Sequence, residues 1–131
     1  MNELLNFEMM SFYSFKNLLV WQKAIEFTKI ILALTNEIKG HYRLLEQLEA
    51  AAASVPQNIA EGKGRVSTKE FIHFLYISRG SLYEAITVVL LLHNINLIDD
   101  NKLEELEGLG IEITKMLNSL ISKERKKLLA D

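Results

Sequence analysis

Glu70 and His73 are separated by two residues, in the segment EFIH, and this spacing places two potential metal ligands on one face of a helix. Helical bundles that bind two iron ions need two such motifs and two further glutamates facing inward. The chain has no second copy, because Ile38 and Leu90 occupy the equivalent places before the other two histidines. We therefore expect no metal, no cofactor and no metal enzyme.

A glycine-rich segment, EGKGR at residues 61–65, has a superficial likeness to a phosphate-binding loop. It lacks the G-x-x-x-x-G-K-[ST] frame and follows a predicted helix rather than a strand. The favoured interpretation is a connection between two helices with solvated charges. The alternative is a small basic patch, because Lys63, Arg65 and Lys69 cluster near a helix N-terminus, which attracts phosphate without sequence preference.

A second basic group closes the chain. It consists of Lys123, Arg125, Lys126 and Lys127. Such residues usually complement the negative end of a helix dipole. With the first group they form the predicted contact surface for nucleic-acid phosphates, although a net charge of −2 argues against a surface that is basic throughout.

Other polar residues suit the fold better than catalysis. Cysteine is absent, and no serine or threonine has a neighbouring base that would activate it as a nucleophile, so we expect no enzymatic activity. Arg79 lies among apolar residues; either its stem covers apolar surface with the head in water, or it forms a buried ion pair with Glu61 or Glu84. The positions predicted to organise the fold are Asn58, Glu61, Arg65, Arg79 and Glu84.

Apolar residues recur at helical spacing in four segments, which we expect to be helices. Their approximate ranges are 16–39, 42–61, 68–94 and 101–129. Gly40 is the expected end of the first, and Gly62 and Gly64 are expected to end the second, since both tolerate the left-handed backbone that a helix terminus often needs.

Two helix starts are indicated by polar residues. Ser67 and Glu70 form a capping box before the third helix, the surest boundary in the chain, and Asp99 or Asp100 caps the fourth. Pro56 lies inside the second segment, where a kink or a break near Ser54 is expected, with Ser54 as the N-cap of a short separate turn in the latter case.

The expected fold is all-α: an antiparallel up-down-up-down four-helix bundle with a Pro-kinked second helix. Residues 15–131 form the bundle and residues 1–14 an N-terminal extension. With 49% hydrophobic residues and no signal peptide, a cytoplasmic protein without a membrane partner is expected, and the stretch AITVVLLL is too short to span a bilayer.

The first and third helices carry more apolar surface than one core can hide, which predicts self-association. The candidates for the oligomer interface are Leu18, Trp21, Tyr76 and Tyr83.

Three motifs resemble a known family. They are FKNL with VWQKA from residue 15, ASVPQNIAEG with GR and STKEF from residue 53, and FLYISRGSLYE from residue 74. In order and spacing, residues 15–120 resemble the four-helix-bundle proteins encoded in intervening sequences of 23S rRNA genes, which are related to accessory variability proteins of retroelements.

That resemblance implies a ring-like homopentamer without established enzymatic activity. It gives two functional hypotheses: a self-associating scaffold or interaction protein, and a nucleic-acid-binding accessory protein whose partner is nucleic acid or a protein that processes it. Family members often carry two basic residues before the central alanines, where this chain has Glu49 and Ala50.

Overall fold

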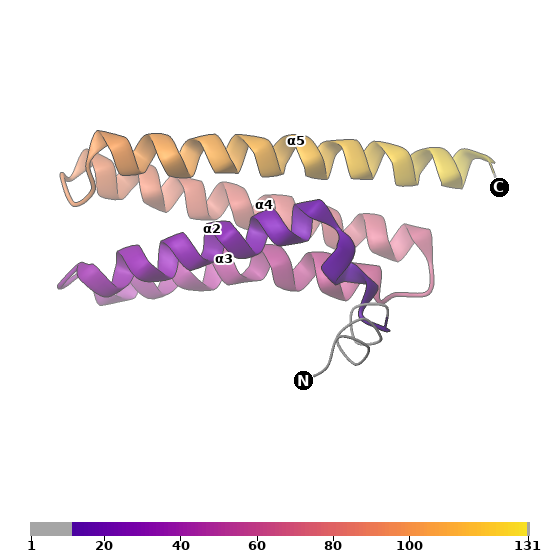
Figure 1. Ribbon diagram of the computed structural model, residues 1–131, viewed down its shortest axis with the longest axis horizontal. Helices are drawn as coiled ribbons and strands as arrows, with labels where there is room; N and C mark the ends of the chain where they lie inside the picture. The colour runs from indigo at the N-terminus through magenta and orange to yellow at the C-terminus, as the bar shows by residue number, and fades with distance from the viewer. Residues whose placement is uncertain (1–11, 131) are drawn as a thin grey trace, which may run out of the picture.

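The structure, a computed structural model, describes residues 12–130. A short 3₁₀ helix, η1 (Ser14–Asn17), precedes four α-helices (Figure 1). These are α2 (Leu19–Glu37), α3 (Tyr42–Lys63), α4 (Thr68–Asn94) and α5 (Asp100–Ala130). Over the described residues no strand occurs, so the prediction of an all-α four-helix protein is confirmed.

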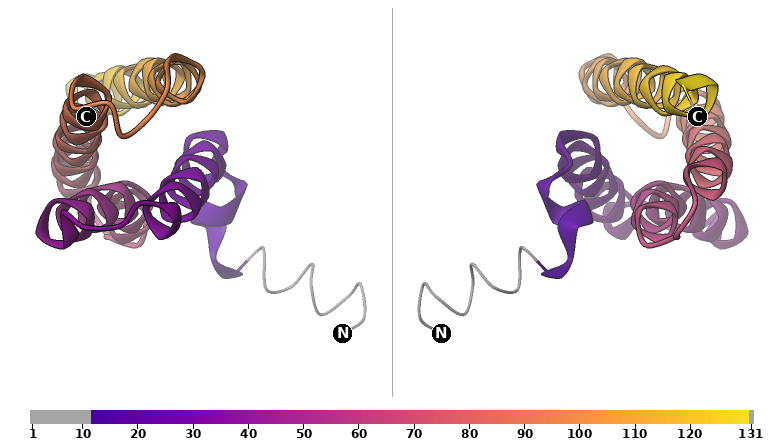
Figure 2. Two further views of the ribbon diagram at one scale, coloured as in Figure 1. Left: turned by 90° about the vertical axis from the view of Figure 1, so that its left-hand side faces the viewer. Right: turned by 90° about the vertical axis from the view of Figure 1, so that its right-hand side faces the viewer.

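The four helices form a closed cycle of contacts. Each helix packs against its neighbours in the chain, and α2 also packs against α5, whereas the backbones of the diagonal pairs α2–α4 and α3–α5 do not approach closely over residues 12–130. Figure 1 shows the helices side by side, with the chain reversing direction at each connection and α5 reaching beyond the others at its C-terminal end. Seen end-on in Figure 2, α2 and α4 lie across the bundle from one another.

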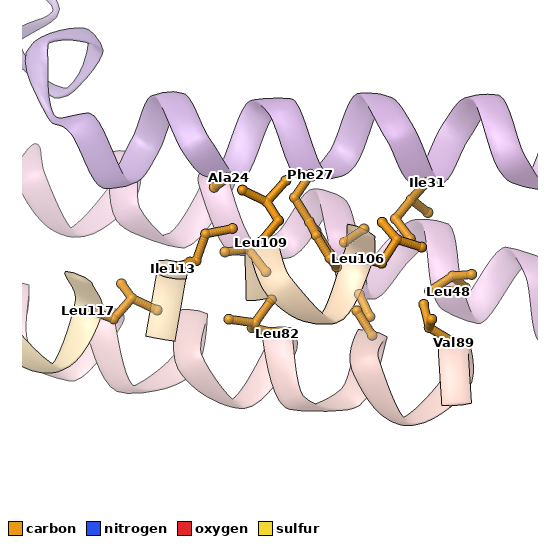
Figure 3. Close-up of a cluster of buried hydrophobic side chains, with 14 of the residues drawn as sticks. Ala24, Phe27, Ile31, Leu48, Leu82, Val89, Leu106, Leu109, Ile113 and Leu117 are labelled. Atoms are coloured by element: carbon orange, nitrogen blue, oxygen red, sulfur yellow. The ribbon is translucent and has the colours of Figure 1, made fainter. Parts of the chain in front are cut away.

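One apolar core runs along the middle of this cycle. All four helices contribute fully buried side chains to it (Figure 3), among them Phe27, Ile31, Leu48, Leu82, Val89, Leu106, Ile113 and Leu117. Each such side chain contributes roughly 1.5–3 kcal/mol through the hydrophobic effect. The core therefore holds the helices together chiefly through apolar contacts.

The first helix is shorter than its sequence pattern predicts. It begins at Leu19 rather than Lys16, because Leu18 has extended backbone (φ −75°, ψ 122°) and the residues before it form η1. It ends at Glu37, and the turn that follows uses left-handed backbone at Gly40 (φ 84°) and His41 (φ 54°). Gly40 is therefore part of the turn that follows the helix and does not itself end the helix.

The glycines at the end of α3 have a different role from the predicted one. The helix ends at Lys63 with Gly64 as its C-cap, so Gly64 does end it, but with right-handed backbone (φ −79°), whereas Gly62 lies within the helix and does not end it. A Cβ atom on Gly62 would lie 2.7 Å from Phe74 Cβ. Gly62 is needed because α4 approaches α3 too closely there for any side chain.

The predicted helix starts of α4 and α5 are confirmed by their caps. Ser67 Oγ accepts the Glu70 backbone N–H at 3.1 Å, and Asp99 Oδ1 accepts that of Lys102 at 2.8 Å. Each bond satisfies one N–H group that would otherwise have no partner in the first turn of the helix. Asp99, rather than Asp100, is the N-cap of α5.

The proline in α3 does not interrupt the helix. Backbone on both sides of Pro56 is helical from Tyr42 to Lys63, so no separate turn begins at Ser54 and this alternative is wrong. Pro56 has no N–H to donate to the Ala52 carbonyl four residues earlier. Thr28 Oγ1 of α2 lies 3.0 Å from that oxygen and 2.8 Å from the Ala24 carbonyl oxygen of its own helix, so its single hydroxyl proton is shared between the two acceptors and gives the Ala52 carbonyl a partner. The kink stays a prediction.

Candidate nucleic-acid interface

The first predicted basic group lies where α3 turns into α4. Lys63 Nζ lies 5.7 Å from the centre of the Phe71 ring, and the Arg65 guanidinium lies 4.9 Å from the centre of the Phe74 ring. Arg65 also pairs with Glu61 across one helical turn, at 2.5 Å. Both cations therefore cover aromatic rings of α4 and keep their charge at the surface.

Lys69 joins this group on the outer surface of α4. Together with Arg65, Glu70, His73 and Phe74 it lines an open hollow of about 510 Å³. The hollow contains both residues of the EFIH motif, but no set of three or more potential metal ligands occurs in the described part of the chain. The hollow thus offers two cations and one carboxylate to an anionic ligand.

The basic residues at the end of α5 point in different directions. The Arg125 guanidinium lies 5.2 Å from the centre of the Tyr76 ring on α4, whereas Lys123 lines a groove against Leu18 and Leu19 beside α2. Lys127 Nζ donates to Glu124 at 3.0 Å, and Lys126 is exposed. The structure brings only Arg125 of this group to α4.

Arg79 does not form the ion pair considered from the sequence. Its Nη1 donates to Asn118 Oδ1 of α5 at 2.8 Å, and its guanidinium lies 4.9 Å from the centre of the Tyr76 ring. Glu61 is paired with Arg65 instead, and the nearest polar partner of Glu84 is Gln47, at 3.5 Å. Arg79 is therefore half-buried between α4 and α5 without a carboxylate partner among the described residues, so the buried ion pair does not form.

Sequence reasoning missed Asn118 and the meeting of two arginines on one tyrosine. These contacts depend on how α4 and α5 are aligned lengthwise, which spacing within either helix does not specify. A usable signal was the spacing of Tyr76 and Arg79, three residues apart, which places an aromatic ring and a cation on one face of the helix.

The two basic groups lie at the same end of the bundle (Figure 1). This end comprises the first halves of α2 and α4, with η1, and the second halves of α3 and α5. It carries eleven of the 15 Lys and Arg residues, namely Lys16, Lys23, Lys63, Arg65, Lys69, Arg79, Lys115, Lys123, Arg125, Lys126 and Lys127. Only five described residues at this end or paired with it are acidic: Glu26, Glu61, Glu70, Glu124 and Glu112, whose carboxylate lies 3.5 Å from Lys23 Nζ. The charge of the bundle is therefore strongly polarised along its axis, although the net charge is small.

The predicted interface residues have unequal exposure. Leu18, Trp21 and Tyr76 are partly buried and pack against the core of their own chain. Tyr83 is 57% exposed and lines a groove of about 460 Å³ between α4 and α5. Ile111, which is 54% exposed, lies in the same groove. Tyr83 is thus the member of the set that remains free for a partner.

Polar groups between α3 and α4 are paired with one another. Asn58 Nδ2 donates to both the carbonyl and the Oγ atom of Ser54, each at 2.8 Å, and Ser54 shares a hydrogen bond of 2.8 Å with Ser81. Ser78 Oγ donates to the Val55 carbonyl at 2.9 Å. The bonds of Ser54 with Ser81 and of Ser78 with the Val55 carbonyl join the two helices, and those of Asn58 lie within α3.

By length and composition alone, α4 could cross a membrane, in contrast to the shorter apolar stretch read from the sequence. Of the most apolar window in this helix, 44% is buried inside the bundle. We interpret α4 as a core helix with a second apolar face.

Together these features define a small four-helix bundle with a polarised surface. Residues 16–119 match the family described as 23S rRNA-intervening sequence protein, and since this range covers most of the chain, the protein belongs to that family. The resemblance seen in the motifs is therefore confirmed.

A solved structure supports the same assignment. It is a protein with unknown function from the S23 ribosomal protein family of Bacteroides thetaiotaomicron, which is 28% identical to this chain with a TM-score of 0.74. The similarity covers 79% of this chain and 98% of that one. No curated protein matches the sequence.

Proposed function

We propose that this protein is a non-enzymatic, self-associating scaffold or interaction protein, built as an up-down-up-down bundle. The observation that carries the proposal is apolar surface on opposite corners of the helix cycle. On α4 the exposed apolar residues are Ile77, Tyr83, Leu90 and Leu91, and on α2 they are Leu19 and Leu32, at two separate places along the helix, with exposed fractions between 36% and 57%.

Two separate apolar surfaces favour a head-to-tail assembly. A two-fold dimer uses one self-complementary surface, whereas a ring brings two different surfaces of each chain together. The occupant that we propose for the α4–α5 groove is therefore α2 of a second copy. The expected assembly is a homopentamer, in line with the family resemblance.

Light scattering after size-exclusion chromatography tests this proposal. The chain has a mass of 15.0 kDa, so a pentamer has a mass of about 75 kDa. We expect Tyr83→Asp to give monomers, because a charge would be buried in the groove without a partner. Tyr42, which is 70% exposed on α3, provides the matched control, and Tyr42→Asp should keep the parent mass. A monomeric parent protein would exclude the proposal.

The polarised charge supports a second candidate function, a nucleic-acid-binding accessory protein. Eleven basic residues at one end give a local positive field that the net charge of −2 conceals. Phosphate contacts from such a surface would be independent of sequence. The partner would then be nucleic acid itself or a protein that processes it.

Binding of labelled nucleic acid at increasing salt tests this candidate. Replacing Lys63, Arg65 and Lys69 together by Gln should weaken binding and lower the slope of log affinity against log salt by about 2. The matched control replaces Lys29, Lys39 and Arg43 by Gln, which removes the same charge from the opposite end. Equal losses in both triple variants would show that the basic end has no special role.

A further inference from the structure

The α4–α5 surface at the basic end holds an unusual group of three side chains. The guanidinium carbons of Arg79 and Arg125 lie 4.9 Å and 5.2 Å from the centre of the same ring, that of Tyr76. They are therefore at most about 10 Å apart. Two positive charges converge here on one half-buried aromatic side chain.

Neither arginine has a carboxylate to balance its charge within residues 12–130. The ion pairs in this part of the chain involve other cations, and Glu124, the acidic neighbour of Arg125 in sequence, bonds to Lys127 instead. The partner of Arg79 is the neutral side chain of Asn118. The group therefore has a local excess of positive charge that an anion would relieve.

The geometry points to a particular kind of anion. A guanidinium group presents a planar fork of donors that suits two oxygens of a phosphate group. An aromatic ring beside it offers a face on which a nucleobase can stack. We propose that Tyr76, Arg79 and Arg125 form a binding subsite for single-stranded nucleic acid, with a phosphate between the arginines and the adjacent base on Tyr76.

This inference rests on the second candidate function and names its substrate class. A single strand fits better than a duplex, since bases in a duplex are already stacked on one another and cannot reach a side chain between two helices. Lys69 lies seven residues before Tyr76 on α4. Two helical turns separate them, so both lie on the same face, about 10 Å apart along the axis. A strand leaving Tyr76 along α4 would meet this further cation.

Asn118 has a positioning role in this arrangement. Its Oδ1 atom accepts from Nη1 of Arg79 and so holds one end of the guanidinium fork between α4 and α5. Arg125 has no such restraint among its contacts in the described chain and is free to swing from the ring to an arriving phosphate. The tyrosine face would then become available to a base.

Fluorescence anisotropy of the full chain with a labelled oligothymidine of about 20 nucleotides, at about 50 mM salt, tests the subsite. We expect Arg125→Gln to weaken binding roughly tenfold, because it removes a bidentate phosphate contact. Tyr76→Leu should weaken binding of the single strand by a similar factor and leave duplex binding nearly unchanged. Lys123→Gln removes the same charge from the other side of α5 and should weaken binding by only about twofold, because Lys123 adds to the positive field of the basic end without belonging to the subsite. Thermal melting followed by circular dichroism confirms that each variant is folded.

The outcomes separate this inference from the function on which it rests. If the parent chain binds no nucleic acid, both are wrong. If it binds, but Arg125→Gln and Lys123→Gln behave alike, the basic end binds nucleic acid and the subsite does not exist. If Arg125→Gln weakens single strands and duplexes equally and Tyr76→Leu changes neither, the site binds phosphate alone and the single-strand assignment is overturned. The single-strand assignment would also be overturned if inorganic phosphate, at the same concentration of phosphate groups, displaced the labelled strand as well as unlabelled oligothymidine does.

Discussion

The two sides of α4 contrast sharply. On the side facing α3, small residues allow close contact: Gly62 admits Phe74, and Ser54, Ser78 and Ser81 make hydrogen bonds between the helices. On the side facing α5, a groove of about 460 Å³ remains, and Tyr83 stays exposed. The comparison shows that one helix can stabilise the fold through one face and keep the other for recognition.

The largest difference between the α3 side and the α5 side of α4 is expected in the free energy of unfolding, when one isoleucine on each side is replaced by alanine. Ile59 is fully buried on α3, so Ile59→Ala removes core contacts and should lower the free energy of unfolding by about 2–5 kcal/mol. Ile111 is 54% exposed in the groove, and Ile111→Ala should change the free energy of unfolding by less than about 0.5 kcal/mol. Urea denaturation measures both, and equal losses would remove the distinction between the sides.

Replacing two glycines by alanine, one at the α3–α4 contact and one on the outer face of α4, is expected to give the next largest difference in stability. In Gly62→Ala the new Cβ meets Phe74 Cβ, an atom fixed to the backbone, and overpacking should cost roughly 1–3 kcal/mol. At Gly80, on the outer face of α4, a Cβ would have no neighbouring atom within 4 Å, so Gly80→Ala should stabilise the helix by about 1 kcal/mol. Thermal unfolding compares the two, and a stabilised Gly62→Ala variant would contradict the close packing.

The other interface of α3 allows a double-variant test. Thr28→Val removes the donor to the Ala52 carbonyl, and the cost should be about 1–2 kcal/mol because Pro56 cannot replace it. Pro56→Ala restores a backbone N–H to that carbonyl. The cost of Thr28→Val should therefore be smaller in the Pro56→Ala background, and additive effects in a denaturation cycle would show that the two residues are not coupled.

The smallest effect is expected on the open side. A Cβ on Gly110 would lie 2.8 Å from Ile86 Cδ1, the flexible end of a side chain at the groove. In Gly110→Ala the gain in helix propensity should offset this crowding, leaving the free energy of unfolding within about 0.5 kcal/mol of the parent value. Denaturant titration beside Gly62→Ala is the measurement, and similar losses in both would show that the groove is as tightly packed as the α3 side.

Local sequence signals predicted the elements whose ends are specified by nearby residues. The third helix was predicted at 68–94 and α4 has these bounds, because the Ser67 cap and the Phe71 that follows act within one turn. The first helix was predicted too long, since the apolar pattern continues through η1 although the backbone at Leu18 is extended. Apolar periodicity alone does not register such a change of direction.

The candidate site was predicted only in part for a similar reason. Lys63, Arg65 and Lys69 are near one another in sequence, so their clustering could be foreseen. Arg79 and Arg125 are far apart along the chain, and their meeting on one ring depends on the packing of α5 against α4. Long-range alignment of this kind arises from the sum of many core contacts.

The sequence by itself determined the number and order of the helices, two of their caps and the family to which the chain belongs, because periodicity, capping and motifs act over short distances. Tertiary structure alone decided that Thr28 satisfies the carbonyl left free by Pro56, that Gly62 admits Phe74, and that two arginines share Tyr76. Each of these contacts joins residues on different helices. Which partners meet depends on the lengthwise alignment of packed helices, and that alignment is set by the whole core.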